Sequence, residues 1–174
     1  MSDLIPSAYD FAAHAHRDQR RKYTGEPYLY HCRDVANMIL DQRMPEEVVA
    51  AALLHDVVED CGVTADDLRG RFGEKVAALV LEVTDISKPE DGNRAARKAI
   101  DREHYGRASP DGKSIKLADL IDNTQSIVTR DPGFAKVYLT EKRLMLPLLK
   151  EGNPHLFRKA WQLAYEGAAP PKAA

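Results

Sequence analysis

The chain has few of the features that mark secreted or membrane-spanning proteins. It contains only two cysteines, Cys32 and Cys61, and they lack CxxC spacing. Neither a disulfide framework nor a cysteine-rich zinc site is therefore expected. No apolar run approaches the roughly 18 residues that a membrane span needs, and residues 1–9 lack the basic and then apolar pattern of a secretory signal. We expect a soluble cytoplasmic protein with free thiols.

Neither sign of charge dominates, because 25 basic residues face 27 acidic ones. This balance gives no global argument for binding nucleic acid or a membrane surface. A chain of 174 residues fits one domain and can bury a core without disulfides or structural zinc. We expect one domain over residues 1–166 and a disordered tail, rich in Ala and Pro, over residues 167–174. The oligomeric state stays open.

Helical periodicity recurs along the chain, and no strand pattern is stronger than the short segment at residues 28–30. Pro45 is typical of a helix start, Gly62 of a helix end, and Thr64 with Asp67 of a capping box. Pro147 should bend a late helix. The sequence predicts an all-α helical bundle, with helices at residues 6–17, from 31 onward, and at 45–62, 65–72, 74–83, 94–104, 115–127, 134–148 and 154–165. Residues 109–112 are expected to form a turn.

Four ionisable residues directly follow the apolar run Ala51–Leu54 within the predicted helix 45–62. They are His55, Asp56, Glu59 and Asp60. On a continuous helix, residues four apart share a face, so all four side chains should point the same way. A helix that is apolar on its other faces belongs in a core, and buried charges need a partner or a metal ion. We therefore expect a metal site here.

Two further polar residues stand at positions whose neighbours imply burial. His31 lies at a helix start, and Asp119 interrupts an apolar stripe. Mixed histidine and carboxylate ligands suit Mn, Fe, Zn or Co. A divalent ion both activates water and neutralises phosphate, so hydrolysis of a phosphoester or pyrophosphate is expected, with Glu59 and Asp60 managing the water. A His-Asp dipeptide alone could also be a hydrogen-bonded surface pair.

The segments AHRDQRRKYTGEPYLYH, AALLHDVVEDCGVTADDLRGRFG, LVLEVTD and KSIKLADLIDNT span residues 15–124. In them the chain resembles the HD superfamily of metal-dependent phosphohydrolases, and more narrowly the alarmone hydrolase domain of Rel/Spo-type enzymes and their small stand-alone relatives. The resemblance implies an HD-domain bundle with a central metal. It also implies hydrolysis of the 3′-pyrophosphate of guanosine tetra- or pentaphosphate, a small-molecule nucleotide, usually with Mn.

The resemblance also implies roles for individual residues. The metal ligands would be His31, His55, Asp56 and Asp119, and the acids that position and activate the attacking water would be Glu59 and Asp60. The implied substrate contacts are Arg21, Lys22 and Asn123, with looser matches at Lys116 and Tyr138. For Lys116, a phosphate contact, a role behind the metal ligands and a solvated helix lysine all remain open.

The chain departs from the Rel/Spo pattern beside Asp119. Where those enzymes commonly have ADRLHN, Leu120 and Asp122 replace an Arg and a His, so a changed substrate rim is expected. The loop from Lys22 to Gly25 carries one extra residue. Two other hypotheses therefore remain: an HD phosphohydrolase for another nucleotide, for example the 2′-phosphate of NADPH, and a nucleotide sensor without turnover.

Overall fold

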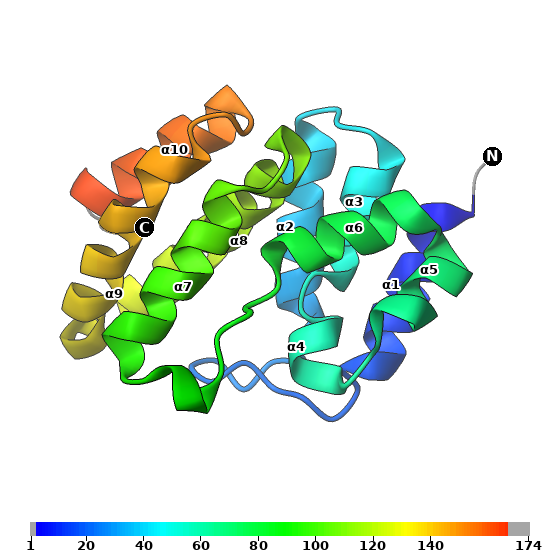
Figure 1. The fold of residues 1–174 in the computed structure, drawn as a ribbon, viewed down its shortest axis with the longest axis horizontal. Coiled ribbons are helices and arrows are strands. Elements are labelled where there is room, and N and C mark those ends of the chain that lie inside the picture. Colours follow the sequence, from blue (N-terminus) through cyan, green and yellow to red (C-terminus); the bar gives the residue numbers. More distant parts are fainter. Residues whose placement is uncertain (1–2, 167–174) are drawn as a thin grey trace, which may run out of the picture.

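The structure is a computed structural model that describes residues 3–166, so the expected tail at residues 167–174 lies outside the described residues. Over this range the fold is helical and contains no β-strand, as expected (Figure 1). The α-helices are α1 (Leu4–Ala15), α2 (Leu29–Asp41), α3 (Glu46–Leu54), α4 (Val57–Cys61), α5 (Ala65–Phe72), α6 (Glu74–Val83), α7 (Arg94–Gly106), α8 (Pro110–Arg130), α9 (Pro132–Met145) and α10 (Pro154–Glu166). Two short 3₁₀ helices are η1 (Pro89–Asp91) and η2 (Leu146–Leu149).

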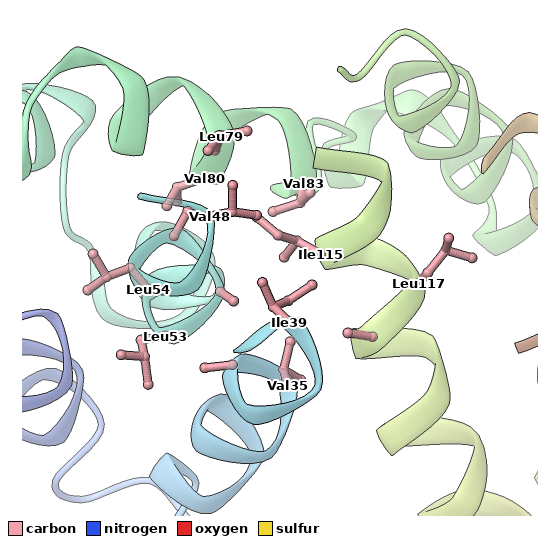
Figure 2. Packing of buried hydrophobic residues seen from close by; sticks show 14 of the residues in the cluster. Val35, Ile39, Val48, Leu53, Leu54, Leu79, Val80, Val83, Ile115 and Leu117 are labelled. Carbon is pink, nitrogen blue, oxygen red and sulfur yellow. The ribbon is translucent and has the colours of Figure 1, made fainter. Parts of the chain in front are cut away.

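Helix α3 is the centre of the larger core. Every residue from Val48 to Leu54 is buried, because the segment is apolar on all faces. It packs against α1, α2, α6 and α8. In Figure 2 the side chains of Val48, Ile39 and Ile115, from α3, α2 and α8, converge on this core. The C-terminal end of α3 is therefore held on several sides.

Helix α8 joins this core to the other end of the molecule, where α9 and α10 lie (Figure 1). Ile115, Leu117 and Ile121 all belong to the larger core, and Figure 2 shows that Ile115 and Leu117 leave α8 on different sides. Helix α8 begins at the N-cap Ser109, whose side chain accepts a hydrogen bond from the backbone N–H of Gly112. The expected turn at residues 109–112 is thus the first turn of a helix, with Pro110 at its start.

The predicted continuous helix 45–62 is wrong, because it is interrupted at His55 and Asp56. Helix α3 ends at Leu54 and α4 begins at Val57. The His55 ring nitrogen Nδ1 contacts the carbonyl oxygen of Ala52 at 2.8 Å, which is the acceptor that the amide of Asp56 would use in an unbroken helix. The four ionisable side chains therefore do not share one helical face. His55 and Asp56 lie in the turn, and Glu59 and Asp60 lie on the short helix after it.

Most other helix boundaries lie where the sequence predicts them, and two local predictions are revised. The capping box of Thr64 and Asp67 is present, and Gly62 ends α4 with a φ of 69°. Residues 28–30 lead into α2 rather than forming a strand. The bend expected at Pro147 appears as η2, after α9 has ended at Met145. Within residues 3–166 no helix is long and apolar enough to cross a membrane.

Replacing Gly152 by Ala should destabilise the protein. A Cβ atom there would lie 2.8 Å from Leu117 Cδ1 and 3.1 Å from the backbone of Lys113 and Ser114. Such overpacking should lower the free energy of unfolding by about 1–3 kcal/mol, measured by urea denaturation. Gly70→Ala is the matched control, because nothing lies within 4 Å of its Cβ, and Ala should raise the stability of α5 by up to about 1 kcal/mol. Equal effects at both sites would contradict the packing argument.

Candidate metal centre and active site

Four side chains from three parts of the fold meet between α2, α3 and α8. His31 comes from the first turn of α2, His55 and Asp56 from the break after α3, and Asp119 from the middle of α8. The Asp56 Oδ2 atom lies 3.6 Å from His31 Nε2 and 3.1 Å from His55 Nε2. The Asp119 Oδ1 atom lies 3.3 and 3.8 Å from the same two nitrogens. The expected ligand set is thus brought together.

The two histidine nitrogens have the environment of metal ligands. Both Nε2 atoms are buried, and neither has a hydrogen-bond partner among the described residues. Donor atoms of His31, His55 and Asp56 lie within 4.8 Å of one another. Nitrogen and oxygen ligands bound to one divalent ion lie roughly 3–3.5 Å from one another. The residues present therefore fit a divalent metal ion.

The other ring nitrogen of each histidine is fixed by a hydrogen bond. His55 Nδ1 donates to the carbonyl oxygen of Ala52 at 2.8 Å, and His31 Nδ1 donates to Asp122 Oδ2 at 2.6 Å. With the proton on Nδ1, the Nε2 lone pair of each ring points to the carboxylates. Burial disfavours charging of both rings, but the surrounding carboxylates outweigh it and raise the pKa of His55 well above its ordinary value. An ion between these groups would replace those protons.

Both carboxylates also have fixed partners. The Tyr28 hydroxyl donates to Asp56 Oδ2 at 2.7 Å, and Lys116 Nζ lies 3.0 Å from Asp119 Oδ2. The Asn123 amide donates to Asp119 Oδ1 at 2.6 Å. Residues 116, 119 and 123 share one face of α8, since they are three and four apart. Lys116 is not a solvated helix lysine, because only 12% of its side chain is exposed.

Glu59 and Asp60 lie on α4, one turn beyond His55 and Asp56. Glu59 Oε2 accepts a hydrogen bond from the backbone N–H of Asp85 at 3.2 Å. Partial desolvation, together with the charges of Asp85 and Asp56, raises the pKa of Glu59 to about 7. Asp60 Oδ2 accepts from the Gln19 amide at 2.8 Å. Glu59 can thus change its protonation state near neutral pH, whereas Asp60 is held from the loop after α1.

Arg21 reaches the site from a tight turn. Its backbone N–H donates to Glu26 at 2.8 Å, and Gly25 closes the turn with a φ of 73°. Arg21 Nη2 lies 2.7 Å from Asp122 Oδ2, and the two side chains border a cavity of about 290 Å³ that also touches His31. Lys22 is exposed and lies 5.0 Å above the Tyr23 ring, so the structure does not place it in this cavity.

The expectation that Leu120 belongs to the substrate rim is wrong. Leu120 is 2% exposed and belongs to the core, because it lies on the face of α8 opposite the cavity. Asp122 does border the cavity. The two departures from the Rel/Spo pattern therefore differ in their effects. Leu120 changes the packing of the core, and Asp122 changes the charge beside His31.

Sequence reasoning missed a second cavity, which is lined by Glu59 and three cationic residues. This cavity of about 310 Å³ is lined by Glu59, Asp85, Ser87, Arg94, Arg97 and Lys98. Lys98 Nζ lies 2.8 Å from Asp85 Oδ2, and the buried Nε of Arg97 has no hydrogen-bond partner among residues 3–166. The sequence of α7 indicates only a polar, solvent-exposed helix. Asp85, in the LVLEVTD segment, was the available signal because it follows a buried helix.

Tyr138 and Lys142 present two more polar groups from α9. The Tyr138 hydroxyl is buried and lacks a hydrogen-bond partner in the described part of the chain, and Lys142 Nζ lies 4.5 Å from the centre of its ring. Burial and the charge of Lys116 lower the pKa of Lys142 to about 8. Only Tyr138 was expected from sequence. Its spacing of four from Lys142 on a helix was the signal for the second residue.

Glu59→Gln should change how the stability of the metal-free protein depends on pH. The pKa is about 7 in the folded state and about 4.3 in the unfolded chain. The folded state therefore holds this proton more tightly, and its stability falls as pH rises between those values. A glutamine side chain does not ionise, so the variant should not lose this stability as the pH rises. Urea denaturation in chelator should show it gaining stability over wild type above pH 7 and none below pH 4; a gain independent of pH would contradict the assignment.

The chain was compared with known proteins. The HD domain family profile matches residues 8–136. The Mus musculus guanosine-3′,5′-bis(diphosphate) 3′-pyrophosphohydrolase MESH1 is 41% identical over 123 residues, which cover 69% of this chain and 67% of that protein. An Aquifex aeolicus guanosine-3′,5′-bis(diphosphate) 3′-pyrophosphohydrolase is 36% identical over 148 residues. That match covers 84% of this chain but only 21% of the relative.

Solved structures agree with the sequence matches. The structure described as a metazoan ortholog of SpoT that hydrolyses ppGpp matches with a TM-score of 0.85 and 30% identity. The match covers 95% of this chain and 96% of that one. A Listeria monocytogenes protein matches with a TM-score of 0.65 and 29% identity. With the buried His and Asp cluster and the all-α fold, these matches establish that the chain belongs to the HD domain family, alongside the MESH1-type 3′-pyrophosphohydrolases.

Proposed function

We propose that the protein hydrolyses the 3′-pyrophosphate of guanosine tetra- or pentaphosphate and releases pyrophosphate with GDP or GTP. The observation that carries this proposal is the pair of buried, unpartnered Nε2 atoms of His31 and His55, which face Asp56 and Asp119 beside an acid whose pKa is near 7. The relatives MESH1 of mouse and human carry the name of this activity.

His31, His55, Asp56 and Asp119 would hold a divalent ion. Two imidazoles and two carboxylates form a mixed nitrogen and oxygen set, which suits Mn²⁺ and would also accept Fe, Zn or Co. When bound, such an ion supplies Lewis-acid chemistry, because it acidifies water and neutralises phosphate charge. Tyr28, Ala52 and Asp122 keep the ligand atoms pointed at the centre through their hydrogen bonds.

Glu59 would accept the proton of the attacking water. A group with a pKa near 7 can take up a proton at neutral pH and release it again. Asp60 would orient the water, because Gln19 occupies one of its oxygens and restrains the carboxylate. The backbone N–H of Asp85 similarly restrains Glu59. Both acids are thus placed by contacts from outside α4.

The cavities on either side suit the two ends of the substrate. Arg94, Arg97 and Lys98 line the cavity next to Glu59, where their charges would bind the departing pyrophosphate. Arg21 and Asn123, which lie together at 3.4 Å, would contact the nucleoside part. Tyr138 and Lys142 would add contacts from α9, and Lys116 would act through Asp119. Lys22 would contact only a part of the substrate that extends beyond the cavity bordered by Arg21.

A second candidate is an HD phosphohydrolase for another nucleotide, such as NADPH with its 2′-phosphate. Asp122 favours it, because a carboxylate at the cavity of Arg21 changes which groups are accepted there. We further propose that the enzyme is cytoplasmic and acts on small molecules rather than nucleic acid or membranes. The two free cysteines and the balanced charge are in keeping with this location.

The test is a product analysis with the Mn²⁺-loaded protein. Guanosine tetraphosphate, NADPH and common nucleotides are incubated at equal enzyme concentration, and products are separated by chromatography. We expect GDP and pyrophosphate from the tetraphosphate, and none with His55→Ala. Preferred release of phosphate from NADPH would favour the second candidate. Tight nucleotide binding without turnover, unchanged by Glu59→Ala, would identify a sensor instead.

Arg97→Gln should weaken substrate binding, because Arg97 lines the cavity beside Glu59 and its buried Nε has no hydrogen-bond partner among the described residues. Losing a hydrogen bond to a charged group costs about 1.5–3 kcal/mol, so KM should rise roughly ten- to hundredfold. Arg107→Gln, at the C-cap of α7, is the matched control. Arg107 is 82% exposed and pairs only loosely with Glu103 at 3.8 Å, so its KM should stay within about twofold of wild type. A similar KM for both variants would exclude this cavity as the phosphate site.

A further inference from the structure

Asp122 touches both a metal ligand and a substrate contact with one oxygen atom. Its Oδ2 accepts from His31 Nδ1 at 2.6 Å and from Arg21 Nη2 at 2.7 Å. The three side chains are largely enclosed, with exposed fractions of 17% for Asp122, 13% for Arg21 and 0% for His31. Charged hydrogen bonds are strong in such surroundings. This position carries a His in the usual Rel/Spo pattern, so the arrangement belongs to this chain.

The two metal-binding histidines are therefore anchored differently. His55 donates to the backbone carbonyl of Ala52, which is neutral and built into α3. His31 donates to a carboxylate, whose negative charge makes the imidazole a stronger ligand at Nε2. Any change in the charge or position of Asp122 would thus act on His31 and leave His55 unaffected.

Arg21 depends on the same anchor. Its other side-chain contact, to Asn123 Oδ1, is long at 3.4 Å, so Asp122 holds the guanidinium. A phosphate that binds Arg21 has to compete with this ion pair. When it succeeds, the whole charge of Asp122 becomes available to His31.

We propose that Asp122 is a positioning residue that couples the metal ligand His31 to the anion-binding residue Arg21. An ion at His31 draws Asp122 toward the imidazole and loosens its hold on Arg21, and a phosphate at Arg21 frees Asp122 for His31. Metal binding and substrate binding therefore strengthen each other, by the same factor in both directions. The inference rests on the proposed function, since it assumes a divalent ion at His31 and a phosphorylated substrate at Arg21.

The experiment uses four proteins: wild type, Asp122→Asn, Arg21→Gln and the double variant. Mn²⁺ affinity is measured by calorimetric titration without nucleotide, and KM for guanosine tetraphosphate is measured at saturating Mn²⁺. Asp122→Asn should raise the Kd for Mn²⁺ roughly 10- to 100-fold in both backgrounds. Arg21→Gln should not raise the Kd for Mn²⁺ above that of wild type. Arg21→Gln should raise KM, whereas Asp122→Asn should lower KM as long as Arg21 is present, because the phosphate no longer competes with the ion pair. In the double variant Asp122→Asn should have no further effect on KM.

Asp34→Asn is the matched control for charge. Asp34 borders the same cavity but pairs with Arg33 at 2.9 Å rather than with His31, so its Kd for Mn²⁺ should stay within about twofold of wild type. Thermal unfolding of the metal-free variants checks that each is folded.

Three results would overturn the inference. They are an unchanged Kd for Asp122→Asn, an equal loss in Asp34→Asn, and additive effects on KM. If wild type itself bound no Mn²⁺, the proposed function would fail with the inference. If wild type bound Mn²⁺ and hydrolysed the alarmone while Asp122→Asn behaved identically, only the inference would fail.

Discussion

Two imidazole nitrogens that are buried without a hydrogen-bond partner within residues 3–166 are the constraint on which the rest of the structure depends. His31 Nε2 and His55 Nε2 face the oxygens of Asp56 and Asp119 at 3.1–3.8 Å, in surroundings where polar atoms without partners are costly. Helix α3 is apolar on every face and ends at this cluster, so the core itself carries the ligands to the centre. The fold thus concentrates charge at the end of its most buried helix, where a metal ion can balance it.

The residues around the cluster of His31, His55, Asp56 and Asp119 form two groups. One group contacts the side chains of the cluster, and the other lines the neighbouring cavities. Tyr28, Lys116 and the Ala52 carbonyl each contact the side chain of one member of the cluster, namely Asp56, Asp119 and His55. Arg21 and Glu59 stand further out, each beside its own cavity. Arg21 and the cations of α7 can attract a phosphate, and Glu59 can take up a proton, whereas the cluster of His31, His55, Asp56 and Asp119 fits an ion. The proposed hydrolysis requires all of these parts together.

Much of the site was predictable from the sequence because burial and polarity conflict there. His31, His55, Asp56 and Asp119 each interrupt an apolar pattern, and such conflicts in sequence mark functional groups. The helix break at His55 was not predictable, because it depends on a side chain that contacts the Ala52 carbonyl. Local propensity for residues 51–60 favours one continuous helix.

The remaining misses have a different physical origin. Arg97 and Lys98 lie on a helix whose polar surface resembles any solvated one, and only the packing of α7 beside Glu59 gives them a role. Leu120 looked like a rim residue because it departs from a family pattern, although its apolar side chain points to the core. Patterns along the chain predict which residues are buried, whereas tertiary packing decides which exposed charges face the same cavity.

The interruption between α3 and α4 has a consequence for how such a site can diversify. Because His55 and Asp56 end the helix that fills the core, a substitution that displaces them also disturbs packing, and selection for stability protects them. Glu59 and Asp60 lie past the break on a short, outer helix, and Arg21 lies on a surface turn. Substitutions at the periphery can therefore alter substrate contacts without disturbing the packing that places His31, His55, Asp56 and Asp119.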